Sequence, residues 1–189
     1  MKDIHDESTW PVWANETIDI VEPNPKWVEK GNQEKALLLN LLSTFGITEI
    51  QHYGSTSIPN LPAKPIIDLM AKIDSFQKSK EISSLLANHD WHYVPPNIDN
   101  RPWQRFFVKV INDKRVVHLH ILLEGEERWD NQLLFRDLLR NNQQFIDEYA
   151  ILKRNLAKKY SNDREAYTKA KTEFINFVLK SWLRTNISL

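Results

Sequence analysis

The chain has 189 residues, 41% of them hydrophobic, which suits one domain with a single sizeable core. Its 25 basic residues balance its 25 acidic residues, so the sequence offers no broad basic surface for nucleic acid. Because cysteine is absent, disulfides, thiolate nucleophiles and zinc-thiolate sites are excluded. The N-terminus has no apolar signal core and no apolar run could span a bilayer, so we expect a soluble, cytoplasmic protein without a membrane partner.

The first part of the chain predicts an arm, a strand and a helix. Residues 1–16 mix charged and hydroxyl side chains with two tryptophans and show no period, so we expect an arm that the tryptophans pin to the body. Residues 17–21 alternate as a strand would, and prolines end them. Residues 27–45 carry a leucine-rich stripe at helical spacing, followed by a glycine that stops the helix.

The middle and the end of the chain predict an α+β core followed by helices. Strands are expected at residues 47–53, 64–73, 91–94, 103–110 and 115–123, with a helix at 75–88 and a turn at the PPNIDN sequence. The last two strands form an antiparallel hairpin. From residue 127 the pattern is helical, with breaks near 141–142 and 161–163. We therefore predict one domain at 17–189, with a sheet core to about 125 and helices from about 126 to 185.

A hydroxyl-rich turn follows the strand that ends near residue 53. Gly54 lets the backbone turn tightly, and Ser55, Thr56 and Ser57 offer hydroxyls and amides that can hold phosphate oxygens. The strand before the turn supplies the context that phosphate binding requires. The same hydroxyls can instead simply cap the next helical turn.

Asp68 stands alone in an almost unbroken apolar strand, and a carboxylate there needs a partner such as a metal ion. His118 and His120 are two residues apart on another strand, so both project from one face. These three can form a two-histidine, one-carboxylate site for a divalent metal, with His52 as a further ligand or a phosphate contact. The structural alternatives stay open: Asp68 can pair with Lys64 or an arginine, and the histidines can serve only packing.

Basic residues can complete a site for phosphates. The candidates that we take from the strand region are Lys64, Arg101, Arg105 and Lys109, and the last three share one parity. If that face opens on a cleft, these cations neutralise phosphate, whereas a solvent-facing edge has no such role. Arg136 and Arg140 share one side of a helix, where they either reach a nucleotide or form surface ion pairs.

Four motifs occur in a fixed order: HYGSTSIP at 52–59, KPIID at 64–68, HLH at 118–120 and FRDLLR at 135–140. On these motifs the chain, from about residue 18 onward, resembles the GrpB family, also called UPF0157, which is placed in the nucleotidyltransferase superfamily. The resemblance implies a small mixed sheet flanked by helices. It also implies a divalent metal and transfer of a nucleoside monophosphate from a nucleoside triphosphate to an unknown acceptor.

The sequence departs from the superfamily pattern of two metal ions held by an acidic pair and a third carboxylate. Met70 stands where the second carboxylate would fall, and the two histidines stand for the third. A thioether is a poor magnesium ligand, so manganese, zinc or a single ion is favoured over a magnesium pair.

Three functions remain open. The first is an active nucleotidyltransferase in which Asp68 and His120 act in catalysis. The second is a nucleotide-binding, regulatory protein that has lost transfer. The third is a metal-dependent phosphohydrolase that activates water. In each case the ligand is a nucleoside triphosphate or another phosphorylated small molecule.

Overall fold

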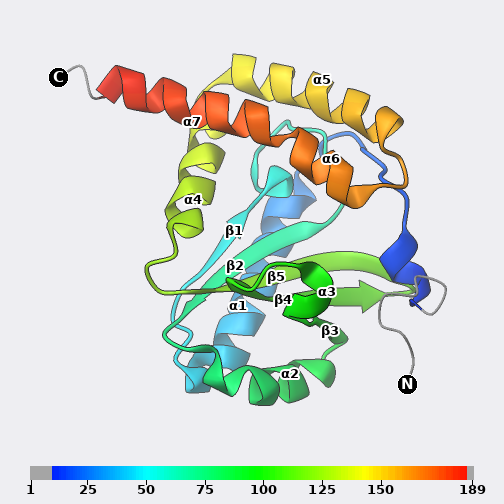
Figure 1. Cartoon of the computed structure of the whole chain (residues 1–189), viewed down its shortest axis with the longest axis vertical. Helices are drawn as coiled ribbons and strands as arrows, with labels where there is room; N and C mark the ends of the chain where they lie inside the picture. Colours follow the sequence, from blue (N-terminus) through cyan, green and yellow to red (C-terminus); the bar gives the residue numbers. More distant parts are fainter. Residues whose placement is uncertain (1–9, 187–189) are drawn as a thin grey trace.

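The computed structural model describes residues 10–186 and has an α+β architecture (Figure 1). Five strands form one mixed sheet in the order β1-β2-β5-β4-β3. The central pair, β2 and β5, is parallel, and the other neighbouring strands are antiparallel. The structure confirms the predicted α+β fold class, a mixed sheet flanked by helices with a helical C-terminal part.

The strands are β1 (Ile50–Tyr53), β2 (Ile67–Ile73), β3 (Trp91–Val94), β4 (Gln104–Ile111) and β5 (Lys114–Leu123). The helices are α1 (Lys26–Leu42), α2 (Ser79–Ala87), α3 (Pro96–Asp99), α4 (Glu127–Arg140), α5 (Gln143–Lys159), α6 (Arg164–Ala170) and α7 (Thr172–Asn186). Short 3-10 turns lie at Val12–Asn15, Ser43–Phe45, Ser55–Ser57 and Phe76–Lys78. Between residues 10 and 186, no helix combines the length and the apolar character that crossing a membrane would need.

Helices α1 and α2 cover one face of the sheet (Figure 1). The main core lies there, because the strand residues that alternate with Asp68 and the two histidines point to these helices. Leu69, Leu119 and Ile121 are all buried in it. The polar residues on the central strands therefore project from the other face.

The C-terminal helices form a second layer beside that other face (Figure 1). Helices α4, α5 and α7 share an apolar cluster that includes Phe135, Tyr149 and Val178. Ile58 and Leu61, from the loop after the hydroxyl-rich turn, are buried in the same cluster. The loop thus attaches the helical layer to the sheet and leaves a cleft between them.

Polar side chains cap the helices where the sequence predicts breaks. Asn142 accepts a hydrogen bond from the amide of Phe145 at the start of α5, and Asp163 accepts one from Ala166 at the start of α6. Such caps satisfy amides that a helix start leaves free. A further break at Lys171, between α6 and α7, was not predicted.

Two local predictions are wrong. Residues 17–21 form no strand of the sheet; only Val21 makes an isolated bridge, with Ala63. The reason is that the apolar residue Ile18 packs on Tyr167 of α6 and so is buried away from the sheet. The PPNIDN segment forms the short helix α3 in place of a turn, with a proline at its first position.

Candidate functional site

A cavity of about 980 Å³ lies between the free face of the sheet and the C-terminal helices. The central strands contribute Asp68, His118 and His120 to its wall, and the turn after β1 contributes Gly54 and Ser55. The cavity thus contains most of the residues that the sequence singled out.

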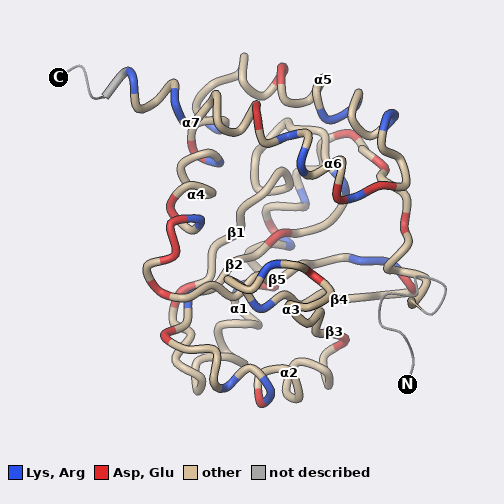
Figure 2. The backbone as a smooth tube through the Cα atoms, in the orientation of Figure 1, with Lys and Arg blue, Asp and Glu red and all other residues tan. Residues whose placement is uncertain are grey.

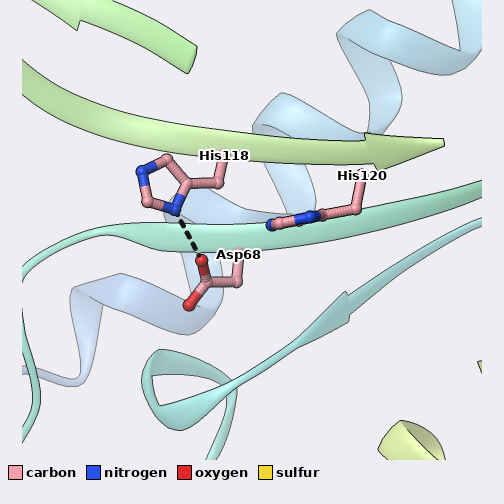
Figure 3. A group of neighbouring side chains, drawn as sticks. All are labelled: Asp68, His118 and His120. Carbon is pink, nitrogen blue, oxygen red and sulfur yellow. Dashed lines mark hydrogen bonds and ion pairs between the residues drawn. The ribbon is translucent and has the colours of Figure 1, made fainter. Parts of the chain in front are cut away.

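Asp68, His118 and His120 form a compact group at the centre of the sheet (Figure 3). Each offers one potential ligand atom, and these atoms lie within 4.8 Å of one another. Asp68 and His118 are register partners in β2 and β5, and Nδ1 of His118 donates to Oδ1 of Asp68 across 3.0 Å. The structure therefore brings together the three predicted ligands.

The surroundings keep both imidazoles neutral and the carboxyl group ionised. Burial lowers the pKa of His118, and it lowers the pKa of His120 to about 3. Burial alone would raise the pKa of Asp68, but the hydrogen bond from His118 and the electrostatic influence of His118, His120 and Lys64 bring it down to about 2. Neutral imidazole and ionised carboxylate are the forms that bind metal ions.

The chemistry of this group fits one divalent metal ion. Nδ1 is the ring atom of His118 that faces Asp68, so an ion shared by these two residues would take the lone pair of Nδ1 in place of the hydrogen bond. The ring proton would then move to Nε2, which is buried and has no hydrogen-bond partner in the described part of the chain. One oxygen and two nitrogen donors suit manganese or zinc better than magnesium. Met70, the register partner of His120, is buried against Leu122 and Trp129 and supplies no hard ligand. The donors therefore fit one ion and not a magnesium pair.

The structure removes His52 from the predicted ligand set. Its register partner is Leu69, which points to α1, so its side chain lies on the opposite face from Asp68. Nε2 of His52 lies 3.1 Å from Oγ1 of Thr56, which donates to the carbonyl of Ile66 across 3.0 Å. Burial lowers the pKa of His52 to about 4, so the ring is neutral. Successive residues of a strand point to opposite faces, so the side chain of Tyr53, and not that of His52, shares the face of Asp68.

The conformation of the turn after β1 depends on the backbone of Gly54 and on hydrogen bonds from two arginines. Gly54 has φ 69° and ψ −175°, which only glycine adopts readily. Arg136 donates to the carbonyl of His52 across 3.0 Å, and Arg140 donates twice to the carbonyl of Ser57, across 2.7 and 3.1 Å. These arginines therefore fix the turn itself, a role that the sequence analysis did not foresee.

The hydroxyls of the turn have different surroundings. Ser57 is fully buried and donates to the carbonyl of Gly54 across 2.7 Å, while Thr56 bonds within the loop as described above. Ser55 lines the cavity, as does Tyr149 of α5. Of the three predicted phosphate-binding hydroxyls, Ser55 is the one best placed to meet a ligand.

Three lysines form a cationic wall in the same cavity as Asp68, His118 and His120. Lys64 precedes β2, Lys153 lies on α5 and Lys171 lies between α6 and α7; all three line the cavity. Lys64 and Lys171 lie over the ring of Tyr167, at 5.5 and 4.5 Å from its centroid. Lys153, only 1% exposed, donates to the carbonyl of Pro62. In Figure 2, basic positions mark α5, the region around α6 and the start of β5.

These lysines make no direct ion pairs, although the negative charge of Asp68 acts on Lys64 and Lys171. Within residues 10–186, none of the three forms an ion pair with a carboxylate. Burial and repulsion from neighbouring cations lower the pKa of Lys64 to about 7 and that of Lys153 to about 6. Burial lowers the pKa of Lys171 to about 8. Uncompensated buried cations are costly, so the wall is suited to a bound anion.

Two of the predicted phosphate-binding cations lie on the wrong side of the sheet. Arg105 lies over the ring of Phe76, 3.8 Å from its centroid, and Lys109 pairs with Glu34 of α1 at 2.9 Å. Both side chains share the face of the main core, because antiparallel partners point the same way and their partners on β5 are core residues. Arg101 does line the cavity, but it lies before β4 begins, so strand parity does not apply to it.

The N-terminal arm closes one end of the cavity. Arg115 donates to the carbonyls of Trp13 and Ala14 across 2.8 and 2.9 Å, and Arg164 pairs with Glu16 at 3.2 Å. The ring of Trp13 lies 5.3 Å from that of His92. These contacts hold residues 13–16 against the body of the fold, while residues 1–9 of the predicted arm lie outside the described range.

Sequence reasoning missed Lys153, Lys171, Arg115 and Arg164 as cavity residues. On a helix, a lysine among many charged neighbours normally predicts a solvated face. The available signal for Lys153 was its position three residues after Ala150, on the apolar side of α5. That spacing alone does not separate a buried lysine from one whose stem merely covers apolar surface.

Comparisons with known sequences agree with the motifs. The family model described as "GrpB protein" matches residues 17–181. The UPF0157 protein YqkA of Bacillus subtilis is 34% identical over 170 residues, covering 89% of this chain and 48% of that protein. The glutamate-rich protein GrpB of Alkalihalophilus pseudofirmus is 30% identical over 164 residues, covering 86% and 94%. The chain thus spans about half the length of the first relative and nearly all of the second.

Two solved structures share the fold. The conserved protein GrpB from Enterococcus faecalis superposes with a TM-score of 0.77 at 28% identity, covering 88% of this chain and 98% of that one. The Cid1 poly(U) polymerase with MgGTP bound superposes with a TM-score of 0.53 at 14% identity, covering 79% and 50%. At that identity the second likeness shows a nucleotidyltransferase-like fold and nothing further.

Proposed function

Because this chain belongs to the GrpB family and has a nucleotidyltransferase-like fold, we propose that it binds a nucleoside triphosphate with one divalent metal ion and transfers a nucleoside monophosphate to an acceptor. The observation that carries the proposal is the cavity that holds Asp68, His118 and His120 together with three lysines that make no direct ion pairs. Polyphosphate is the ligand that needs a metal ion on one side and cations on the other.

The lysine wall would bind the phosphate chain. A triphosphate would supply anionic oxygens to pair directly with Lys64, Lys153 and Lys171, whose pKa values are lowered in the fold. Because their pKa values are lowered, these lysines would take up protons when phosphate binds. Ser55 would add a hydroxyl donor beside them, on a backbone that Arg140 keeps in place.

A bound metal ion would act as a Lewis acid on the phosphate where transfer takes place. Asp68, His118 and His120 would hold it. With pKa values of about 2 and 3, Asp68 and His120 are poor proton acceptors near neutral pH. Their catalytic contribution would be to hold the ion and not to deprotonate the acceptor.

A nucleotide-binding protein without transfer activity is the second candidate. The observation that favours it is Met70, which is 1% exposed and takes the place of a carboxylate that would help to hold a second ion. A single ion binds a triphosphate but cannot clamp both the attacking and the leaving oxygen. A phosphohydrolase, the third candidate, would use the same ligands with water as the acceptor.

A thermal-shift panel tests the proposal. The four nucleoside triphosphates are each combined with Mg²⁺, Mn²⁺ or Zn²⁺, on wild type, on Asp68→Asn and on the surface control Asp113→Asn. A ligand at a hundredfold excess over its Kd stabilises the folded state by about 2.7 kcal/mol. We expect a metal-dependent triphosphate shift in wild type and the control that Asp68→Asn loses.

The products then separate the three candidates. Pyrophosphate release that needs an acceptor indicates transfer, phosphate release into water indicates hydrolysis, and binding with no product indicates a sensor. If wild type melts cooperatively and no combination shifts its melting temperature, the proposal of a nucleotide site is wrong.

A further inference from the structure

A chain of partly buried polar contacts begins at His120, beside the candidate metal site. Gln104 is 5% exposed, and its Oε1 lies 2.9 Å from Nδ1 of His120. Its Nε2 donates to Oδ2 of Asp99 across 2.6 Å. Oδ1 of Asp99 in turn pairs with Arg101 at 3.1 Å. No part of this chain of contacts is needed to build the sheet, because all the bonds join side chains.

The chemistry of the partners fixes the direction of each hydrogen bond. An ionised carboxylate accepts hydrogen bonds and donates none, so Gln104 must present its NH₂ group to Asp99. The carbonyl oxygen of the same amide then faces His120, and it can only accept. Nδ1 of His120 must therefore carry the proton, which leaves Nε2 with a free lone pair.

The ring of His120 is also held in one plane. Phe106 stacks on it with a centroid distance of 4.6 Å and an interplanar angle of 23°, and Tyr53 meets it edge-on at 5.8 Å. Nε2 has no hydrogen-bond partner among residues 10–186, and His120 lines the cavity. Figure 3 shows the ring extending from β5 toward Asp68 and His118.

We propose that Asp99 and Gln104 are positioning residues that hold His120 as the Nδ1–H tautomer, so that its Nε2 lone pair is presented to a metal ion beside Asp68. The tautomer follows from the hydrogen bonds alone, whereas the metal rests on the proposed function. Fixing the tautomer and the orientation of a ligating imidazole is what outer partners do in known metal sites.

This proposal gives the short helix α3 a role. Asp99 is its last residue, and Asn100, with φ 56°, reverses the chain directly after it. The helix thereby places Asp99 within hydrogen-bonding distance of Gln104, the first residue of β4. The turn-like PPNIDN sequence is thus part of the site.

Nitrogen-15 NMR of histidine in the metal-free protein tests the tautomer directly. The signals of His120 are assigned by their loss in His120→Gln. We expect wild type to show a protonated Nδ1 and a bare Nε2. In Asp99→Asn the amide of Gln104 can turn over and donate to Nδ1, so we expect the Nε2–H tautomer to grow. A wild-type ring protonated on Nε2, or an Asp99→Asn spectrum identical to that of wild type, overturns the proposal.

Zn²⁺ and Mn²⁺ affinities, measured by competition with a chelating dye, test the consequence for the metal. Gln104→Leu removes the acceptor, and we expect it to bind 10- to 100-fold more weakly, as is typical when an outer partner is lost. Gln104→Glu keeps an acceptor oxygen and should restore part of that loss. Asp113→Asn, in the exposed hairpin turn, is the control for an altered charge.

The outcomes separate this proposal from the proposed function. If wild type binds neither ion, the metal assignment is wrong, and the NMR spectra still decide whether Asp99 and Gln104 fix the tautomer. If wild type binds and a folded Gln104→Leu binds equally well, the positioning role is overturned. If Gln104→Leu does not fold, Asp99→Asn, which keeps the size of the side chain, replaces it in both measurements.

Discussion

Asp68 and His118 lie side by side on the two parallel central strands, and Oδ1 of Asp68 accepts a hydrogen bond from Nδ1 of His118 at 3.0 Å. The residues are 50 positions apart in the chain, so the fold creates this contact. The bond fixes the carboxylate of Asp68 in a mostly apolar strand. The second oxygen of this carboxylate, Oδ2, lies next to Gly54, and both residues line the cavity. A bond of this kind stabilises the fold and fixes the positions of both side chains on the wall of the cavity.

Gly54→Ala should disturb Asp68 directly. A Cβ at this position would lie 2.6 Å from Oδ2 of Asp68, and φ at 69° disfavours any side chain. We expect a loss of about 1–3 kcal/mol in the free energy of unfolding, together with weaker metal binding because the carboxylate must move. Urea unfolding and a Zn²⁺ titration measure the two effects.

Gly125→Ala is the matched control. Gly125 also has a positive φ, 82°, but a Cβ there would meet no atom within 4 Å. We expect this variant to lose stability while its metal affinity stays at the wild-type value. Equal loss of metal affinity in the two variants would show that backbone strain, and not the contact with Asp68, governs the site.

His52→Ala should lower stability and leave metal affinity unchanged, because His52 lies on the core face, against Gly31 of α1. A Cβ on Gly31 would lie 2.2 Å from Nδ1 of His52, so Gly31→Ala alone should be strongly destabilising. In the double variant the new methyl group can occupy the space that the imidazole leaves. A double-mutant cycle measured by urea unfolding should therefore show coupling of at least about 1 kcal/mol. Additive losses would contradict this packing.

The sequence predicted the ligand group because strand parity is local. His118 and His120 share a face whatever the rest of the fold does, and Asp68 is conspicuous in an apolar strand. Parity does not say which face opens on the cleft. For that reason Arg105 and Lys109 were placed on the cleft side, although they pack toward α1 and α2.

Other parts of the site depend on tertiary contacts that no local pattern records. In the sequence, Lys153 is one of several charged residues in α5, and its burial results from the packing of α5 in the folded protein. Asp99 and Gln104 are five residues apart, on a helix and a strand, and meet only because Asn100 reverses the chain. Polar side chains of this kind are common on surfaces, so their pairing becomes visible only in the fold.

Lys153→Met should stabilise the ligand-free protein most at low pH. The pKa of Lys153 is lowered to about 6 in the fold from the usual 10.5. Between these values the unfolded chain binds more protons than the folded one, so wild-type stability rises with pH by up to about 1.4 kcal/mol per unit. Below pH 6 both states are charged and the full penalty remains.

The stability of Lys153→Met relative to wild type should therefore be highest at pH 5 and fall steadily toward pH 9. Thermal melts across this range measure the difference. The exposed Lys158 on the same helix gives the control Lys158→Met, which should show no such trend. A difference between Lys153→Met and wild type that stays constant with pH would mean that the lysine is charged in the fold throughout.

Arg140→Lys should weaken nucleotide binding even though it keeps the positive charge. Arg140 donates two hydrogen bonds to the carbonyl of Ser57, across 2.7 and 3.1 Å, and a single ammonium cannot reproduce that fork. We expect the triphosphate-induced thermal shift to shrink, with a stability loss of about 1–3 kcal/mol from the poorly satisfied carbonyl, while Zn²⁺ affinity without nucleotide is retained. Arg154→Lys, on the exposed side of α5, is the control and should keep the full shift. If Arg140→Lys also keeps it, the arginine contributes only charge, and the backbone of the turn does not need its support.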